Sequence, residues 1–172
     1  QAAFAPANLA KLYNRVEPGF IRVDADEVTY PAHVILRYEL ERDLIEGRIE
    51  VADLPALWDG KMQQWLGLST QGNYQNGCMQ DIHWTDGSFG YFPSYTLGAM
   101  YAAQLRFALE RELGDLGQLI AAGRLPEIFG WLGRHIWSQG SLHGTDELIR
   151  RATGEALNPQ WLRKHLEQRY LK

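Results

Sequence analysis

The sequence has 172 residues, 45% of them hydrophobic and 22% charged, so it is long enough to bury a substantial core as one domain over residues 1–172. Its 17 basic and 21 acidic residues give a formal net charge of −4, which disfavours nucleic acid as a partner. The single cysteine, Cys78, excludes an internal disulfide and fits a reducing compartment. No leader-like or long apolar segment is present, which favours a soluble cytoplasmic protein without a membrane partner.

Apolar residues recur at helical spacing along the chain, and glycine or proline stands at the ends of most of these segments. The pattern predicts helices over residues 6–16, 33–46, 54–66, 93–113, 115–122, 125–138, 145–153 and 158–170. Asp53 suits the N-cap of the third helix, and Pro93 suits the first turn of the fourth. The sequence therefore predicts an all-α fold.

Residues 77–98 read GCMQDIHWTDGSFGYFPSYTLG, a stretch too polar for a core strand and too aromatic for an ordinary solvent loop. Glycines at positions 77, 87 and 90 permit tight turns within it. We expect an ordered loop that presents functional groups from a rigid scaffold. The alternative is a well-packed connector whose His and Asp side chains satisfy buried backbone groups.

The histidine spacing argues against a zinc site in this chain. A zincin requires two His four residues apart on one helix, with a Glu between them as general base. No pair has that spacing among the five histidines, which are His33, His83, His135, His143 and His165. The sequence therefore predicts that this chain alone binds no metal.

Two short motifs resemble signatures of a known peptidase family. The first, I-R-x-x-A-D, is matched by Ile21, Arg22, Ala25 and Asp26. The second, G-x-x-Q-D-x-H-W, is matched by Gly77, Gln80, Asp81, His83 and Trp84. With the continuations DEVTYPAHVILRYELE and GYFPSYTLG, the chain resembles the Taq-type (thermostable) zinc metallocarboxypeptidases over most of its length. It lacks the HExxH helix and third ligand Glu of that family, which lie upstream of the matched region.

The resemblance implies that the chain is the C-terminal part of a larger, mostly helical, zincin-like metallopeptidase, and that it forms one wall of a groove. The complete enzyme would release C-terminal amino acids from peptides with zinc as its cofactor, although cobalt suits similar ligands. The isolated chain is expected to be inactive, because the HExxH part is missing. The implied partners are peptides with a free C-terminus, the N-terminal portion of the same enzyme and a second copy in a homodimer.

Arg22 is the candidate for binding the terminal carboxylate of the substrate, because a fixed guanidinium donates two parallel hydrogen bonds to a carboxylate. Reasoning from the residues alone favours a different role, an internal ion pair with Asp24 or Asp26 that fixes the loop. The resemblance favours carboxylate binding, with Asp26 orienting or packing the loop.

His83 and Tyr95 are the catalytic candidates, since each could donate a hydrogen bond to the scissile carbonyl or to the oxyanion that forms from it. A lone His beside Trp is also commonly structural. Asp81 could accept the N–H of a metal-bound His contributed by the missing portion. The remaining candidates are Gln80 and Tyr91 as substrate contacts and Trp84 as a wall of the site.

A second hypothesis is a free-standing, non-catalytic helical module that binds peptide C-termini or a protein partner without cleaving them. The missing HExxH motif favours this hypothesis for the isolated chain. Whether the native polypeptide extends upstream of Gln1 distinguishes the two hypotheses.

Overall fold

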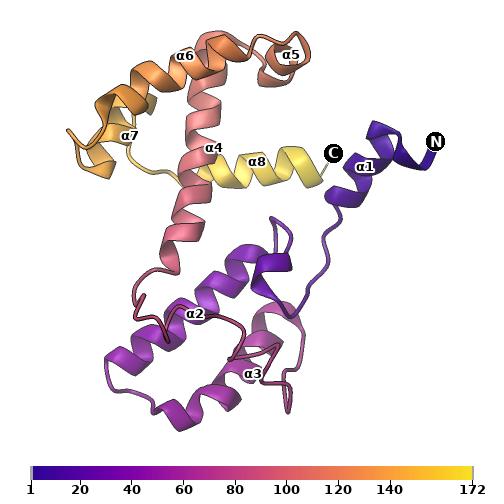
Figure 1. Ribbon diagram of the computed structural model, residues 1–172, viewed down its shortest axis with the longest axis vertical. Coiled ribbons are helices and arrows are strands. Elements are labelled where there is room, and N and C mark those ends of the chain that lie inside the picture. The colour runs from indigo at the N-terminus through magenta and orange to yellow at the C-terminus, as the bar shows by residue number, and fades with distance from the viewer. Residues whose placement is uncertain (1, 172) are drawn as a thin grey trace. The chain divides into compact units, whose positions relative to one another are not determined.

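The computed structural model describes residues 2–171, which form helices and connecting loops and contain no strand. The α-helices are α1 (Pro6–Tyr13), α2 (Tyr30–Ile45), α3 (Leu54–Leu66), α4 (Pro93–Leu113), α5 (Leu116–Ala121), α6 (Leu125–His135), α7 (Thr145–Thr153) and α8 (Gln160–Tyr170) (Figure 1). Short 3-10 turns are η1 (Ala2–Phe4), η2 (Arg22–Asp24), η3 (Val51–Asp53) and η4 (Trp137–Gln139). The predicted all-α fold is confirmed. No helix in the described part of the chain has the length and apolarity to cross a membrane.

The chain divides into two compact units, one ending at Thr96 and the other beginning at Leu97. The division falls in the first turns of α4. The prediction of a single domain over residues 1–172 stays a prediction.

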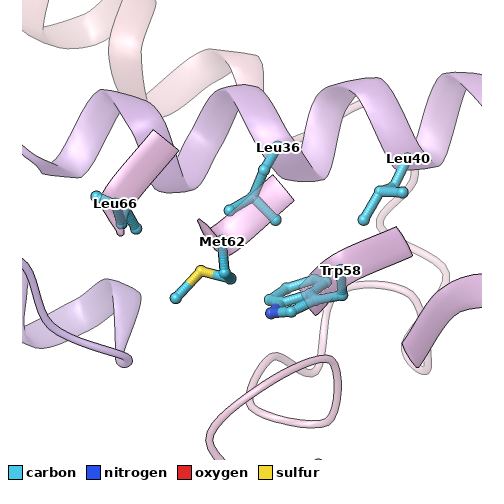
Figure 2. Packing of buried hydrophobic residues seen from close by; sticks show 5 residues of the cluster. All are labelled: Leu36, Leu40, Trp58, Met62 and Leu66. Atoms are coloured by element: carbon cyan, nitrogen blue, oxygen red, sulfur yellow. The ribbon is translucent and has the colours of Figure 1, made fainter. Parts of the chain in front are cut away.

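The core of the first unit lies between α2 and α3 (Figure 2). Leu36 and Leu40 project from α2, four residues apart and therefore on one helical face, toward a row of side chains on α3. That row consists of Trp58, Met62 and Leu66, which are also spaced by four residues. All five side chains are buried, and Trp84 and Cys78 from the following loop pack against them. The loop therefore rests on the core of this unit.

A second stripe of α2 is polar, and it is buried too. His33, Arg37 and Glu41 follow one another at four-residue spacing, with exposed fractions of 0%, 0% and 5%. Charged groups are rarely buried to this extent unless other groups hydrogen-bond or pair with them. This stripe therefore marks where α2 meets polar partners elsewhere in the unit.

Residues that favour helix ends account for the boundaries of α3 and α4, although one side chain does not form the expected cap. Gly67 ends α3 in the left-handed conformation at φ +70°, which glycine adopts without steric cost. Pro93 is the first residue of α4, as predicted. Asp53 occupies the N-cap position of α3, as predicted, but its side chain accepts no hydrogen bond from that helix. Its carboxylate instead accepts the backbone N–H of Glu50 at 2.9 Å, because residues 51–53 form a 3-10 turn that brings the Asp53 side chain back to the residue before that turn.

In the second unit, α4 contacts the other helices through both buried apolar side chains and a buried polar side chain. Leu109 of α4 and Trp131 of α6 belong to one buried cluster. Gln104, 1% exposed, donates to the hydroxyl of Thr153 at 2.8 Å and accepts from the backbone N–H of Asn158 at 2.8 Å. These contacts fix the segment that leads from α7 to α8.

Candidate functional site

The buried carboxylate of Glu41 holds the loop of residues 77–92, which we call the aromatic loop, against α2. Glu41 Oε2 accepts the indole N–H of Trp84 at 2.7 Å, and its Oε1 accepts the backbone N–H of Gly90. Gly90 lies at φ +74°, where a side chain would be strained. In the first unit, the stretch from α3 to α4 can be followed alongside α2 in Figure 1. The expected ordered loop is therefore present, and Trp84 anchors it.

Arg22, at the start of η2, is buried and paired with this loop. Its side chain is 6% exposed, and Nε and Nη2 both donate to Asp81 Oδ1, at 3.0 and 2.8 Å. Its Nη1 donates to the hydroxyl of Tyr30 at 2.7 Å. The ion pair expected with Asp24 or Asp26 is thus replaced by one with Asp81. Burial lowers the pKa of Arg22, but the hydrogen bond and charge of Asp81 outweigh it, so the pKa is raised.

The second oxygen of Asp81 is taken by another arginine. Arg37 on α2 is fully buried, its Nε donates to Asp81 Oδ2 at 2.5 Å, and its Nη1 donates to the carbonyl of His33 at 2.7 Å. Burial lowers the pKa of Arg37 to about 10, which leaves it protonated at neutral pH. Burial also raises the pKa of Asp81, but the two arginines outweigh it and lower that pKa. We call Arg22, Asp81 and Arg37 the arginine–aspartate cluster; it carries two positive charges and one negative charge.

His33 borders this cluster as a neutral side chain. It is fully buried, and neither ring nitrogen makes a hydrogen bond of good geometry within the described residues. Burial, followed by the positive charge of Arg37, lowers the pKa of His33 to about 4, against smaller opposing effects of the Gly19 backbone and Asp81. His33 therefore adds no charge to the site at neutral pH.

His83 and Tyr95, the predicted catalytic pair, lie together beside the cluster. His83 Nε2 and the Tyr95 hydroxyl are 2.9 Å apart, and His83 Nδ1 lies 4.0 Å from Asp81 Oδ1. The His83 ring stacks on Phe92 with centroids 4.3 Å apart. Arg22 Cζ lies 4.8 Å from the centroid of the Tyr95 ring, within cation–π range. The structure thus brings three sequence-predicted residues into one place.

Tyr91 forms the outer edge of this aromatic group. Its ring centroid lies 5.3 Å from that of Tyr95 and 5.8 Å from that of His83, and its side chain is half exposed. It is therefore the member of the predicted site that is best placed to meet an incoming molecule. A substrate contact by Tyr91 stays a prediction.

The side chains of Gln80 and Asp26 form hydrogen bonds mainly with backbone groups. The Gln80 carbonyl accepts the N–H of Arg22 at 2.8 Å, and its amide nitrogen faces the carbonyls of Phe20, Asn76 and Gly77 at 3.0, 2.9 and 3.1 Å. Asp26 accepts from the backbone N–H groups of Glu17, Val28 and Thr29 and from the Thr29 hydroxyl. Both side chains therefore fix the loop that carries Arg22.

Sequence reasoning missed three residues of the site: Tyr30, Arg37 and Glu41. The sequence carries little signal for the last two, because other residues of α2 are also charged (Glu39, Arg42 and Asp43) and the buried polar stripe does not stand out among them. Tyr30 carried no comparable signal, since its role depends on where Arg22 points. The hydrogen bonds that place the missed residues in the site join positions 8 to 49 residues apart in the sequence.

The described residues do not fit a metal site. No group of three or more His, Cys, Asp or Glu side chains between residues 2 and 171 is arranged to hold a metal ion. Both oxygens of Asp81 already accept from arginines. A role for Asp81 toward a metal-bound His stays a prediction.

Comparison with known proteins connects this chain to one family. The family described as "Carboxypeptidase Taq (M32) metallopeptidase" matches residues 2–170. Carboxypeptidase 1 of Bacillus subtilis is 41% identical over 163 residues, and thermostable carboxypeptidase 1 of Thermus thermophilus is 43% identical over 157 residues. These matches cover 95% and 91% of this chain but only 32% and 31% of the two relatives.

Solved structures share the fold as well. Metallocarboxypeptidase 1 of Trypanosoma cruzi superimposes with a TM-score of 0.96 at 52% identity, covering 100% of this chain and 36% of that protein. The M32 carboxypeptidase of Deinococcus radiodurans gives a TM-score of 0.93 at 36% identity, covering 98% of this chain and 34% of that protein. The chain thus spans about a third of the length of the relatives that it matches.

The neutral, buried state of His33 predicts a pH-dependent stability. Because the folded-state pKa of about 4 lies below the ordinary value of 6.5, the unfolded chain takes up the proton first as the pH falls. Stability is therefore full above pH 6.5 and is lost between pH 6.5 and 4, by about 3 kcal/mol in total. Urea unfolding at pH 7 and pH 5 measures this slope. In His33→Phe, which cannot titrate, the slope should be shallower; an unchanged slope would contradict the assignment.

Proposed function

Because the chain belongs to the carboxypeptidase Taq (M32) metallopeptidase family, we propose that it is part of a metallocarboxypeptidase that releases C-terminal amino acids from peptides. This chain would bind the terminal carboxylate of the substrate through Arg22 and would contact the reacting carbonyl through Tyr95. One observation carries the proposal: the buried arginine–aspartate cluster has a surplus positive charge.

The surplus charge calls for an anion. Arg22 and Arg37 share the single negative charge of Asp81, which is the largest charge acting on either of them. Glu41 lies one turn beyond Arg37 on α2, but its oxygens accept from the indole of Trp84 and the backbone of Gly90, so it does not pair directly with either arginine. A buried charge without a counter-ion is unfavourable. A peptide carboxylate would balance it, and a charge-assisted hydrogen bond in this poorly solvated place is strong.

Arg22 also retains donors for such a ligand. A guanidinium has five N–H groups, and three of those on Arg22 donate to Asp81 and Tyr30. One N–H remains on each of Nη1 and Nη2. Tyr30, Asp81 and the Gln80 amide hold the guanidinium and its backbone in place, so we infer that Gln80 and Asp26 position Arg22 and do not contact substrate.

The His83–Tyr95 pair would act at the scissile bond. When His83 Nε2 carries the ring proton, it donates to the Tyr95 oxygen and leaves the Tyr95 O–H free to donate to a developing oxyanion. Packing of His83 on Phe92 fixes the ring for this purpose. We infer that Tyr95 is the catalytic residue of the pair, that His83 orients it, and that Tyr91 lines the entrance.

The motif resemblance supports the remaining elements of the proposal. The metal, zinc or cobalt, would be held by an N-terminal portion of the same enzyme, and this chain would form one wall of the groove. The enzyme would act as a homodimer. The single cysteine of this chain fits the reducing environment of the cytoplasm, where we expect the enzyme to act.

Arg22→Lys in the full-length enzyme tests the carboxylate assignment. Lysine keeps the charge but loses the planar set of donors, so kcat/KM for peptides with a free carboxyl end should fall about 10- to 100-fold. Turnover of the matching C-terminal amides, already low, should change little. Steady-state kinetics on both substrate series measures the difference.

Arg42→Lys is the matched control, because Arg42 lies on α2 with a side chain that is 46% exposed. It should leave both series unchanged. An equal fractional loss for acids and amides in Arg22→Lys would assign Arg22 to structure and remove the main support of the proposal.

Tyr95→Phe tests the contact at the scissile bond. Removing the hydroxyl should lower kcat on the order of 100-fold with little change in KM, because the lost hydrogen bond would form mainly in the transition state. Tyr101→Phe, on the same helix, is the control and should retain wild-type kcat. A rise in KM at constant kcat would instead make Tyr95 a residue that binds the ground state.

A further inference from the structure

We propose that Arg37 is a positioning residue for the substrate carboxylate: it orients Asp81, which in turn holds Arg22, and it supplies the positive charge that keeps the cluster cationic. This inference rests on the proposed function of Arg22. Arg37 itself would not touch the substrate, because its side chain is fully buried.

Arg37 is fixed on several sides. Its Cζ lies 4.5 Å from the centroid of the Trp58 ring and 5.6 Å from that of Phe92. Its Nη1 is bound to the carbonyl of His33, one turn earlier on α2. These contacts leave Nε directed at Asp81 Oδ2, at 2.5 Å. A charged group this well immobilised can orient its partner without cost in side-chain entropy at the moment of binding.

The two oxygens of Asp81 bind different arginines, and this arrangement depends on Arg37. Arg37 occupies Oδ2, so that Oδ1 alone receives the two donors of Arg22. Without Arg37, the carboxylate could rotate and accept from Arg22 through both oxygens as a one-to-one pair. That pair would be neutral, and Arg22 would then attract a substrate carboxylate far less strongly.

If Arg37 only stabilised the fold, its removal would not specifically weaken the binding of a substrate carboxylate. Nη2 of Arg37 is buried and has no hydrogen-bond partner among the described residues. An unpaired buried donor is unfavourable, so this N–H group does not itself stabilise the fold. Replacement by an apolar residue of similar length leaves Asp81 paired with Arg22, and buried pairs of that kind tolerate apolar neighbours.

Arg37→Met in the full-length enzyme tests the proposal. We expect KM for peptides with a free carboxyl end to rise about 10-fold, with kcat and the turnover of C-terminal amides nearly unchanged. The inhibition constant of N-acetyl-phenylalanine should rise by a similar factor, while that of its amide stays constant. Arg42→Met, an exposed position on the same helix, should leave all of these values unchanged.

Arg37→Lys separates charge from packing and remains informative if Arg37→Met fails to fold. Lysine keeps the cluster cationic, so its KM for free-carboxyl peptides should stay within about 3-fold of wild type. A fall in kcat/KM for free-carboxyl peptides in Arg37→Lys as large as that in Arg22→Lys would overturn the proposal. So would equal losses for acids and amides in Arg37→Met, or an unchanged KM.

The measurements distinguish failure of the role proposed for Arg37 from failure of the role proposed for Arg22. If Arg22→Lys loses its preference for free carboxyl ends but Arg37→Met keeps it, the proposed function stands and the role of Arg37 is overturned. If neither variant alters that preference, the assignment of Arg22 itself has failed.

Discussion

The first unit depends on one carboxylate shared between two buried arginines. Asp81 comes from the aromatic loop, Arg37 from the middle of α2 and Arg22 from η2. Each of these charges would be unfavourable in the interior alone, and together they are stable because each has charged hydrogen bonds. The cluster thereby ties three separate segments together. It also leaves one positive charge unbalanced at a place where other polar side chains converge.

Other contacts of the loop make this arrangement rigid. Glu41 holds Trp84 and Gly90 against α2, and Gln80 binds the backbone at the start of η2, at Phe20 and Arg22. Most polar side chains of the two motifs therefore bind protein. A rigid outer shell of this kind is what a binding group requires, because a guanidinium held in advance loses little freedom when its ligand arrives. The same reasoning separates Arg22 and Tyr95, which can still donate to a ligand, from Gln80 and Asp26. The amide N–H groups of Gln80 and both oxygens of Asp26 are already bound to protein.

The helices could be predicted from the sequence because their signals are local. Apolar spacing and flanking Gly and Pro placed each α-helix to within three residues at either end. The motif resemblance identified Arg22, His83 and Tyr95 as site residues, and the structure places them beside one another, while their roles stay predictions. Arg37 could not be found this way, because its partner lies 44 residues away. Asp53 lies at the predicted N-cap position of α3, but its carboxylate binds the backbone N–H of Glu50 in the preceding 3-10 turn.

A crystal structure of the full-length enzyme with a slowly cleaved blocked dipeptide tests the central claim most directly. The account predicts that the terminal carboxylate lies about 3 Å from Nη1 and Nη2 of Arg22, with Asp81 still bound between Arg22 and Arg37. The substrate carbonyl oxygen should lie within hydrogen-bond distance of the Tyr95 hydroxyl. A carboxylate bound to another cation, with Arg22 contacting only Asp81 and Tyr30, would contradict the account and make the cluster purely structural.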